Sequence, residues 1–279
     1  MRPSRPCRLP ACPLLLGLLV LAACQGQAPD GAAPTAEAPD AATAQAHVAL
    51  EDVVESGEGY LVGISYPRSI EAHPGLAKAL KAYADDARAD LRQALAMPEA
   101  DGGDPTVPGP YDLSLAFTAL PGTPDVVAVA ADGSSYLGGA HGQPLVRRWV
   151  WLPAERRMLT AEALIPDPAG WEAVSEYVRE RLFEQLSLRL ADEGIAPEDR
   201  AEWLRTEGAM IEAGTEPSPG HFDQFEPVPG AGGKLAGLRF VFPPYQVGPY
   251  AAGTHSVDVP ARVLLPHVAP AYRDLFATR

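Results

Sequence analysis

Hydrophobic and polar residues alternate in several short runs of this chain, and this alternation predicts strands. Residues 60–66 (YLVGISY) and 111–120 (YDLSLAFTAL) place hydrophobic side chains at every second position, which is typical of strands with one buried face. Further runs rich in Val, Trp or Phe occupy residues 126–131, 145–152, 234–243 and 255–260. Because turn-forming residues separate these runs closely, we expect most of them to pair as antiparallel neighbours.

Two other stretches, residues 76–97 and 171–191, repeat hydrophobic residues every three or four positions, which predicts helices that pack on a sheet. Pro197 is expected to open a second, more polar helix that runs to about residue 212, and residues 261–276 are expected to be partly helical. Asp167-Pro168 is a typical helix start, with Asp as the cap and Pro in the first turn. The order of strands and helices predicts an α+β fold, a mostly antiparallel sheet with packed helices.

The first residues have the pattern of a bacterial lipoprotein signal. Basic residues precede an apolar run at residues 14–21, and Leu21-Ala22-Ala23 leads to Cys24 as in a lipobox. The run is shorter than the ~20 residues of a spanning helix. We therefore expect cleavage before Cys24 and lipidation of Cys24, with a short signal-anchor as the alternative. Gln25 favours the outer membrane, facing the periplasm, over retention in the inner membrane.

These observations divide the chain into four parts: a signal peptide (1–23), a lipidated flexible tether (24–46), an N-terminal α+β subdomain (47–110) and a C-terminal α+β domain (111–279). The tether is predicted from its Ala-, Pro- and Gln-rich composition, which cannot bury enough apolar surface to fold. Cys7 and Cys12 would leave with the signal. The mature chain would then carry no disulfide, thiol nucleophile or thiolate metal site.

Charge narrows the set of partners. The formal net charge is -14, and removal of the signal would leave 19 basic against 36 acidic residues. Such a protein disfavours nucleic acid and anionic lipid and attracts cationic proteins. Residues 192–226 are the most acidic stretch, with ten acidic and two basic side chains. This stretch is either a solvated face or a docking surface for a cationic partner.

The sequence contains no recognisable catalytic signature. Its six histidines are scattered, and no H-E-x-x-H, G-x-S-x-G, phosphate-loop or dinucleotide fingerprint occurs. We therefore expect a protein without enzymatic activity, cofactor or metal. The alternative that remains is His141 as a metal ligand, or as a base together with Asp258 or His255. A lone histidine in a glycine-rich turn is more often a hydrogen-bonded structural residue.

Two glycine-rich, aromatic motifs, YLGGAHG at residues 136–142 and PPYQVGPYAAG at residues 243–253, follow strand-like runs. Their candidate binding or structural residues are Tyr136, Gly138, Gly139, His141, Tyr245, Tyr250 and Gly253. The tyrosines either form an aromatic binding surface or pin loops. Because glycines permit close backbone approach, we predict that the two motifs lie together on one sheet. A buried His141 would then take a hydrogen-bond partner from outside its own turn.

Together the motifs resemble those of the RsiV/PdaC-like domain-of-unknown-function family, over residues 60–279. That family includes the ectodomain of a lysozyme-sensing anti-sigma factor, the non-catalytic part of a peptidoglycan deacetylase and many envelope lipoproteins. The resemblance implies an RsiV-like α+β fold in a non-catalytic envelope lipoprotein that binds a cationic protein such as lysozyme, or peptidoglycan. The alternatives are a structural envelope-assembly lipoprotein and a cell-wall glycan hydrolase or deacetylase. A deacetylase is disfavoured because Asp223 has no second aspartate beside it.

Overall fold

The computed structural model describes residues 48–97 and 110–278. The expected signal peptide, the lipidation of Cys24 and the tether lie outside these residues. Residues 45–279 form one compact unit.

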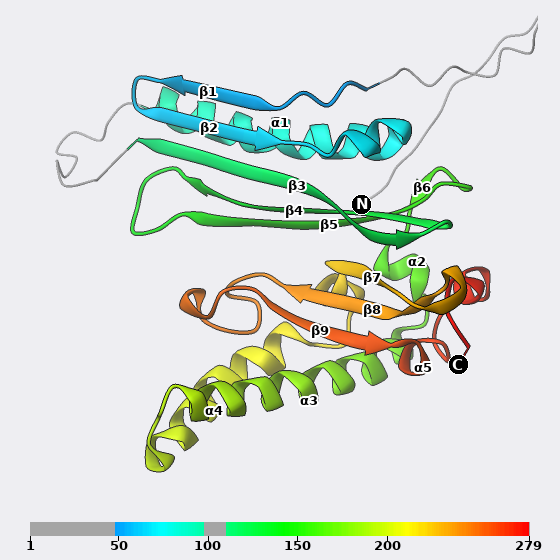
Figure 1. The fold of residues 1–279 in the computed structure, drawn as a ribbon. Helices are drawn as coiled ribbons and strands as arrows, with labels where there is room; N and C mark the ends of the chain where they lie inside the picture. The colour runs from blue at the N-terminus through cyan, green and yellow to red at the C-terminus, as the bar shows by residue number, and fades with distance from the viewer. Residues whose placement is uncertain (1–47, 98–109, 279) are drawn as a thin grey trace, which may run out of the picture. The chain divides into compact units, whose positions relative to one another are not determined.

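A six-stranded sheet organises the first half of this unit (Figure 1). Its strands follow the order of the chain: β1 (Val53–Gly57), β2 (Tyr60–Ser65), β3 (Tyr111–Thr123), β4 (Val126–Tyr136), β5 (Gln143–Leu152) and β6 (Arg157–Met158). All neighbours are antiparallel except β2 and β3, which are parallel. A parallel pair needs a long crossover, and helix α1 (Pro74–Ala96) lies within that connection.

A second, three-stranded antiparallel sheet contains β7 (Phe225–Pro229), β8 (Leu235–Phe242) and β9 (His255–Pro260). Two long helices precede it, α3 (Pro168–Asp192) and α4 (Pro197–Gly214). The short elements are α2 (Ala161–Leu164), α5 (Ala261–Leu264), η1 (Arg68–Ala72), η2 (Pro219–Phe222), η3 (Ala231–Gly233), η4 (Tyr250–Ala252) and η5 (Pro270–Leu275). The predicted start of α3 is confirmed, because the Asp167 carboxylate accepts a hydrogen bond from Ala169 N–H at 3.0 Å and Pro168 is the first helical residue.

Two clusters of buried hydrophobic side chains hold these layers together. The first joins α1 to one face of the six-stranded sheet and includes Leu80, Leu113 and Leu115. The second joins the three-stranded sheet, α3 and the side chains of Val150 and Leu152 on β5. Figure 1 shows the three-stranded sheet between the six-stranded sheet and helices α3 and α4. Since β1, β2 and β3 share one sheet, that sheet crosses the expected boundary between residues 110 and 111.

Strand β4 is longer than its sequence predicts. The pattern ended this strand at residue 131, before Asp132-Gly133, yet β4 continues to Tyr136. Both neighbours explain the extension, because Gly133 is paired with Leu115 on β3 and with Leu145 on β5. Within the described part of the chain, no helix combines the length and the apolar character needed to cross a membrane.

The two sheets are connected by a partly buried ion-pair network centred on Arg148 of β5. The Arg148 Nε–H donates to Glu226 Oε1 of β7 at 2.6 Å, and Nη1 donates to Asp132 Oδ1 of β4 at 3.0 Å. The Arg148 side chain is only 7% exposed and that of Glu226 14%. The Arg148 backbone N–H also donates to Gln224 Oε1 at 2.8 Å. This network fixes β7 against the larger sheet.

Candidate functional site

The two sequence motifs meet at His141. The His141 Nδ1–H donates to the carbonyl oxygen of Gly142 at 3.0 Å, which leaves Nε2 as an acceptor. The Tyr245 hydroxyl donates to Nε2 at 2.9 Å across more than a hundred residues of sequence. The Tyr250 ring stacks on the imidazole with 4.2 Å between ring centroids. We call the contact among His141, Tyr245 and Tyr250 the His–Tyr clasp.

The predicted proximity of the motifs is therefore confirmed, but their placement on one sheet is wrong. His141 lies in the connection between β4 and β5 of the larger sheet. Tyr245 and Tyr250 lie in the connection between β8 and β9 of the smaller sheet. The connections can meet because β7, which pairs with β8, contacts β3, β4 and β5. The clasp thus links the two sheets, as Arg148 does.

The backbone of the second motif is held in an unusual conformation at Tyr245. Its φ of 75° lies in the left-handed region, which a bulky residue adopts rarely. A hydrogen bond from Tyr245 N–H to Gly248 O at 3.0 Å closes the turn. The conformation leaves Tyr245 51% exposed while its hydroxyl reaches His141. A half-exposed tyrosine in a fixed turn can serve both as a loop anchor and as a contact for a ligand.

The other candidate residues shape the loops that carry the clasp. Gly138 and Gly139 have φ values of 97° and 99°, and Gly253 has a φ of 75°, conformations that glycine adopts at little cost. The Tyr136 hydroxyl donates to the Gly139 carbonyl oxygen at 3.1 Å, within its own turn. Tyr136 and these glycines therefore support the loops rather than add polar groups to the clasp.

We expect His141→Ala to lower the free energy of unfolding by about 1–2 kcal/mol. The substitution removes the acceptor of the Tyr245 hydroxyl and the ring that stacks on Tyr250. Urea denaturation measures the change. Tyr245→Phe, which removes only the hydroxyl, is expected to cost about 0.5–1.5 kcal/mol. The double variant should cost less than the two single changes added together, because both remove the same hydrogen bond. A change within about 0.5 kcal/mol for His141→Ala would contradict a stabilising clasp.

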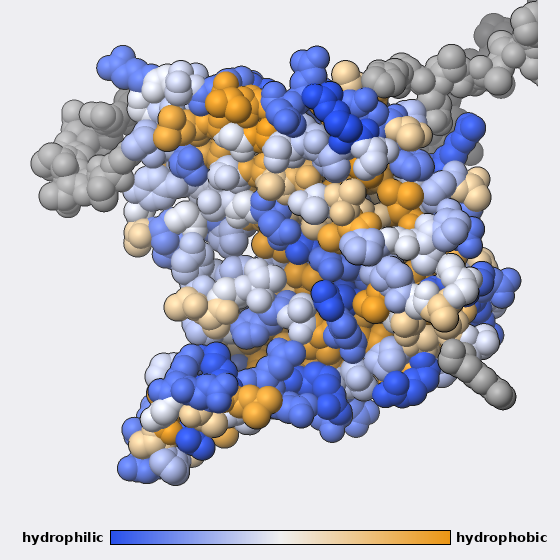
Figure 2. Space-filling view, in the orientation of Figure 1, coloured by the Kyte–Doolittle hydropathy of each residue, from blue (hydrophilic) through white to orange (hydrophobic). Residues whose placement is uncertain are grey.

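Helix α4 carries half of the acidic side chains in the stretch that the sequence singles out. Of the ten acidic side chains in residues 192–226, seven are exposed: Asp192, Glu193, Glu198, Asp199, Glu202, Glu212 and Glu216. The other three are less exposed and pair with arginines, Glu207 with Arg189, Asp223 with Arg147 and Glu226 with Arg148. Two of the exposed carboxylates also form ion pairs, Glu193 with Arg189 and Glu202 with Arg205. Trp203 is 44% exposed on the same helix. Figure 2 shows the surface over α3 and α4 as mostly hydrophilic, with a few hydrophobic groups.

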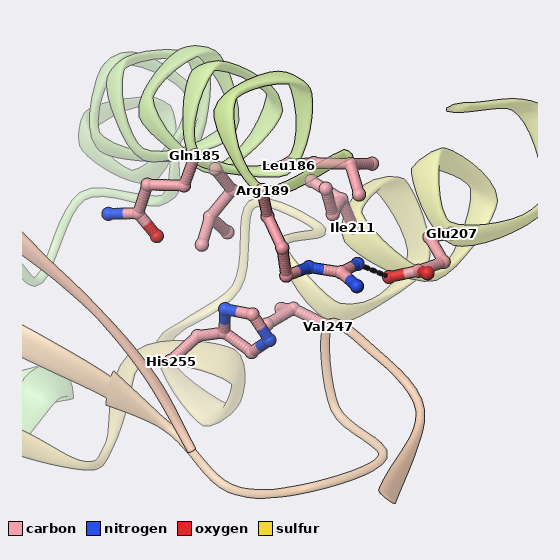
Figure 3. A pocket seen from close by; sticks show the side chains of 8 residues that line it. Gln185, Leu186, Arg189, Glu207, Ile211, Val247 and His255 are labelled. Atoms are coloured by element: carbon pink, nitrogen blue, oxygen red, sulfur yellow. Dashed lines mark hydrogen bonds and ion pairs between the residues drawn. The ribbon is translucent and has the colours of Figure 1, made fainter. Parts of the chain in front are cut away.

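A cavity that sequence patterns did not predict lies between α3, α4 and β9 (Figure 3). Its volume is about 230 Å³, and Arg189, Glu207 and His255 are its charged or titratable wall residues. Burial, followed by the charge of Arg189, lowers the pKa of His255, which therefore favours the neutral imidazole. No sequence signal could have joined these residues, because they come from three separate elements.

The structure does not support the alternative that pairs His141 with Asp258 or His255. Both Asp258 oxygens bond to Arg239, at 2.6 and 2.9 Å. His255 lines the α3–α4 cavity, whereas both ring nitrogens of His141 are occupied in the clasp. Among the described residues, no group of three or more His, Cys, Asp or Glu side chains is arranged to hold a metal ion.

Residues 169–262 match the model of a family described as "Protein of unknown function (DUF3298)". This segment runs from α3 into α5 and contains α4, the second motif and all residues that line the cavity. No curated protein matches the chain.

Two crystal structures of DUF3298 family proteins are similar to this chain. One, from Pseudomonas aeruginosa PAO1, has a TM-score of 0.50 at 15% sequence identity and covers 82% of this chain and 96% of its own. The other, from Bacteroides fragilis NCTC 9343, has a TM-score of 0.46 at 14% identity and covers 76% of this chain and 85% of its own. The first likeness shows the fold, and the predicted α+β class is confirmed.

Proposed function

We propose that this chain is a non-catalytic binding module of a lipid-anchored envelope protein, at the outer membrane facing the periplasm, and that it binds a cationic protein such as lysozyme. The observation that carries this proposal is Trp203, an exposed tryptophan on a helix that also exposes the carboxylates of Glu198, Asp199, Glu202 and Glu212. Tryptophan is enriched among residues that dominate binding energy at interfaces. Surrounding carboxylates would steer a cationic partner towards it.

Two further observations support the proposal. The motifs that meet in the clasp resemble those of the RsiV/PdaC-like proteins, among them the ectodomain that senses lysozyme. The lipobox at Cys24 is typical of a chain tethered to the envelope. Peptidoglycan is the second candidate ligand, because the half-exposed Tyr245 beside Tyr250 offers aromatic faces on which a sugar ring could pack.

Lysozyme should bind this chain at low ionic strength and lose affinity as salt is added, because salt screens attraction between exposed charges. Trp203→Ser is expected to weaken binding by about tenfold or more at every salt concentration. Replacing Glu198, Asp199 and Glu202 together by their amides should instead flatten the salt dependence. Isothermal titration calorimetry at two salt concentrations measures both effects.

Val54→Ser is the matched control, because Val54 is also an exposed hydrophobic side chain but lies on β1. It should leave lysozyme binding unchanged. Absence of binding at low salt would exclude lysozyme as the partner, and equal affinity of the Trp203→Ser protein would exclude α4 as the surface. If peptidoglycan fragments bind instead, Tyr245→Ala should weaken their binding, whereas Trp203→Ser should not.

A further inference from the structure

The cavity between α3, α4 and β9 has the lining of a small-molecule site. Leu182, Leu186, Ile211 and Val247 supply apolar walls, and Gln185, Arg189, Glu207 and His255 supply polar groups. Figure 3 shows Arg189 reaching from α3 to Glu207 on α4, with His255 and Val247 on the opposite side. An apolar pocket with a few polar groups is the usual composition of a ligand site.

Two polar atoms in this wall lack a partner within the described part of the chain. Glu207 is only 4% exposed, and its Oε1 accepts no hydrogen bond, although its other oxygen accepts one from Arg189. The buried Nε2 of His255 is also unpaired. A buried polar atom without a partner costs about 1–3 kcal/mol, which is why such atoms are rare in folded proteins. Both residues line the same cavity, so a single occupant of that cavity is the simplest partner for their unpaired atoms.

Size and charge restrict what this occupant can be. The cavity's volume of about 230 Å³ is below the ~300–1,000 Å³ that is typical of sites for drug-sized ligands. The Glu207 carboxylate is already paired with Arg189, so an additional charge would be buried without a counter-ion. The unpaired carboxylate oxygen can only accept a hydrogen bond, so the ligand must donate one.

We propose that this cavity binds a small uncharged molecule with an aliphatic body and a hydroxyl group that donates to Glu207 Oε1. Leu182, Leu186, Ile211 and Val247 contact the aliphatic body, and His255 lies beside the polar end. This site is separate from the exposed face of α4. The proposal for the cavity therefore does not depend on whether the chain binds a cationic protein.

Three soluble probes of similar shape test the proposal on the full-length chain: cyclohexanol, cyclohexanone and the cyclohexylammonium ion. Methyl NMR spectra report binding through the shifts of the four apolar lining residues. Cyclohexanol should bind at least tenfold more tightly than cyclohexanone, which cannot donate to Glu207, and more tightly than the charged ammonium ion. If none of the probes binds at millimolar concentration, the cavity holds only water and the proposal is overturned.

Glu207→Gln gives a second, sharper readout. The glutamine oxygen can still accept from Arg189, which places an NH₂ donor where the unpaired oxygen was. The preference for cyclohexanol should therefore be lost, because the hydroxyl and the ketone oxygen can both accept from the NH₂ group. Glu212→Gln, an exposed carboxylate on the same helix, is the control and should leave the preference unchanged.

Two variants, Leu186→Phe and Ile211→Phe, fill the cavity with a larger side chain, and each should abolish binding of cyclohexanol. We call them the filled variants. Thermal denaturation identifies whichever of them remains folded for this comparison. Loss of the preference for cyclohexanol in Glu207→Gln, together with loss of binding in a folded filled variant, supports the site. An unchanged preference in Glu207→Gln, or full binding by a folded filled variant, overturns it.

Discussion

Replacing Arg148 by Met should lower the free energy of unfolding by about 3–5 kcal/mol, which is a large part of the stability of a typical domain. Methionine keeps much of the length of the arginine side chain but removes the charge that pairs with Glu226. The Glu226 side chain is 14% exposed, so it would remain largely buried without its bonded partner. Asp132 is 55% exposed and would be solvated by water instead. Chemical denaturation of the variant measures the loss.

The neighbouring residue provides a matched control. Arg147 also forms an ion pair, with Asp223 at 3.0 Å, but both side chains are 41% exposed. Exposed pairs contribute little, so Arg147→Met should change stability by no more than about 1 kcal/mol. Equal effects of the two substitutions would contradict the argument from burial.

A second replacement separates the cost of an unpaired charge from the loss of the arginine itself. If Glu226 is changed to Leu in the Arg148→Met protein, no buried charge remains between the sheets. Replacement of a whole buried pair by hydrophobic residues is often neutral, so the double variant should be more stable than Arg148→Met alone. A further loss of stability in the double variant would show that the network acts through something other than charge.

The elements with a regular hydrophobic pattern were predictable from the sequence. The alternation at Leu113, Leu115 and Phe117 predicted a strand with one buried face, and all three side chains are buried on β3. The predicted hydrophobic stripe of α3 is likewise buried: Trp171, Val174, Val178, Leu182, Leu186 and Leu190. These predictions succeed because burial of one face sets the period of an amphipathic strand or helix.

Pairings between distant elements were predictable only in part. Glycines and aromatic residues in both motifs were enough to predict that His141 meets the second motif, and the Tyr245 hydroxyl is its partner. Neither the parallel pairing of β2 with β3 nor the origin of the clasp from two sheets has a local signal, since topology decides both. Glu207 lies on a mostly polar helix, so only the packing of α4 against α3 buries it.

Gly133 shows how such packing overrides a local signal, and it carries the second large prediction. Asp-Gly is a common turn sequence, yet here Gly133 lies inside β4 with a paired strand on each side. A Cβ atom on Gly133 would lie 2.0 Å from the carbonyl oxygen of Ser114 and 2.9 Å from the Cα of Leu115. Both obstacles are backbone atoms of β3, so they cannot move aside as a flexible side chain could.

Gly133→Ala should therefore lower the free energy of unfolding by about 3 kcal/mol, the upper part of the range for overpacking. Gly63 on β2 is the control, because it lies in the same sheet and pairs with Ser114, but a Cβ there would meet no atom within 4 Å. Gly63→Ala should raise stability by about 0.5–1 kcal/mol, since alanine loses less backbone entropy in a strand. Urea denaturation of both variants measures the opposite signs. A Gly133→Ala protein as stable as the wild type would mean that β3 and β4 are farther apart at this position than the paired register places them.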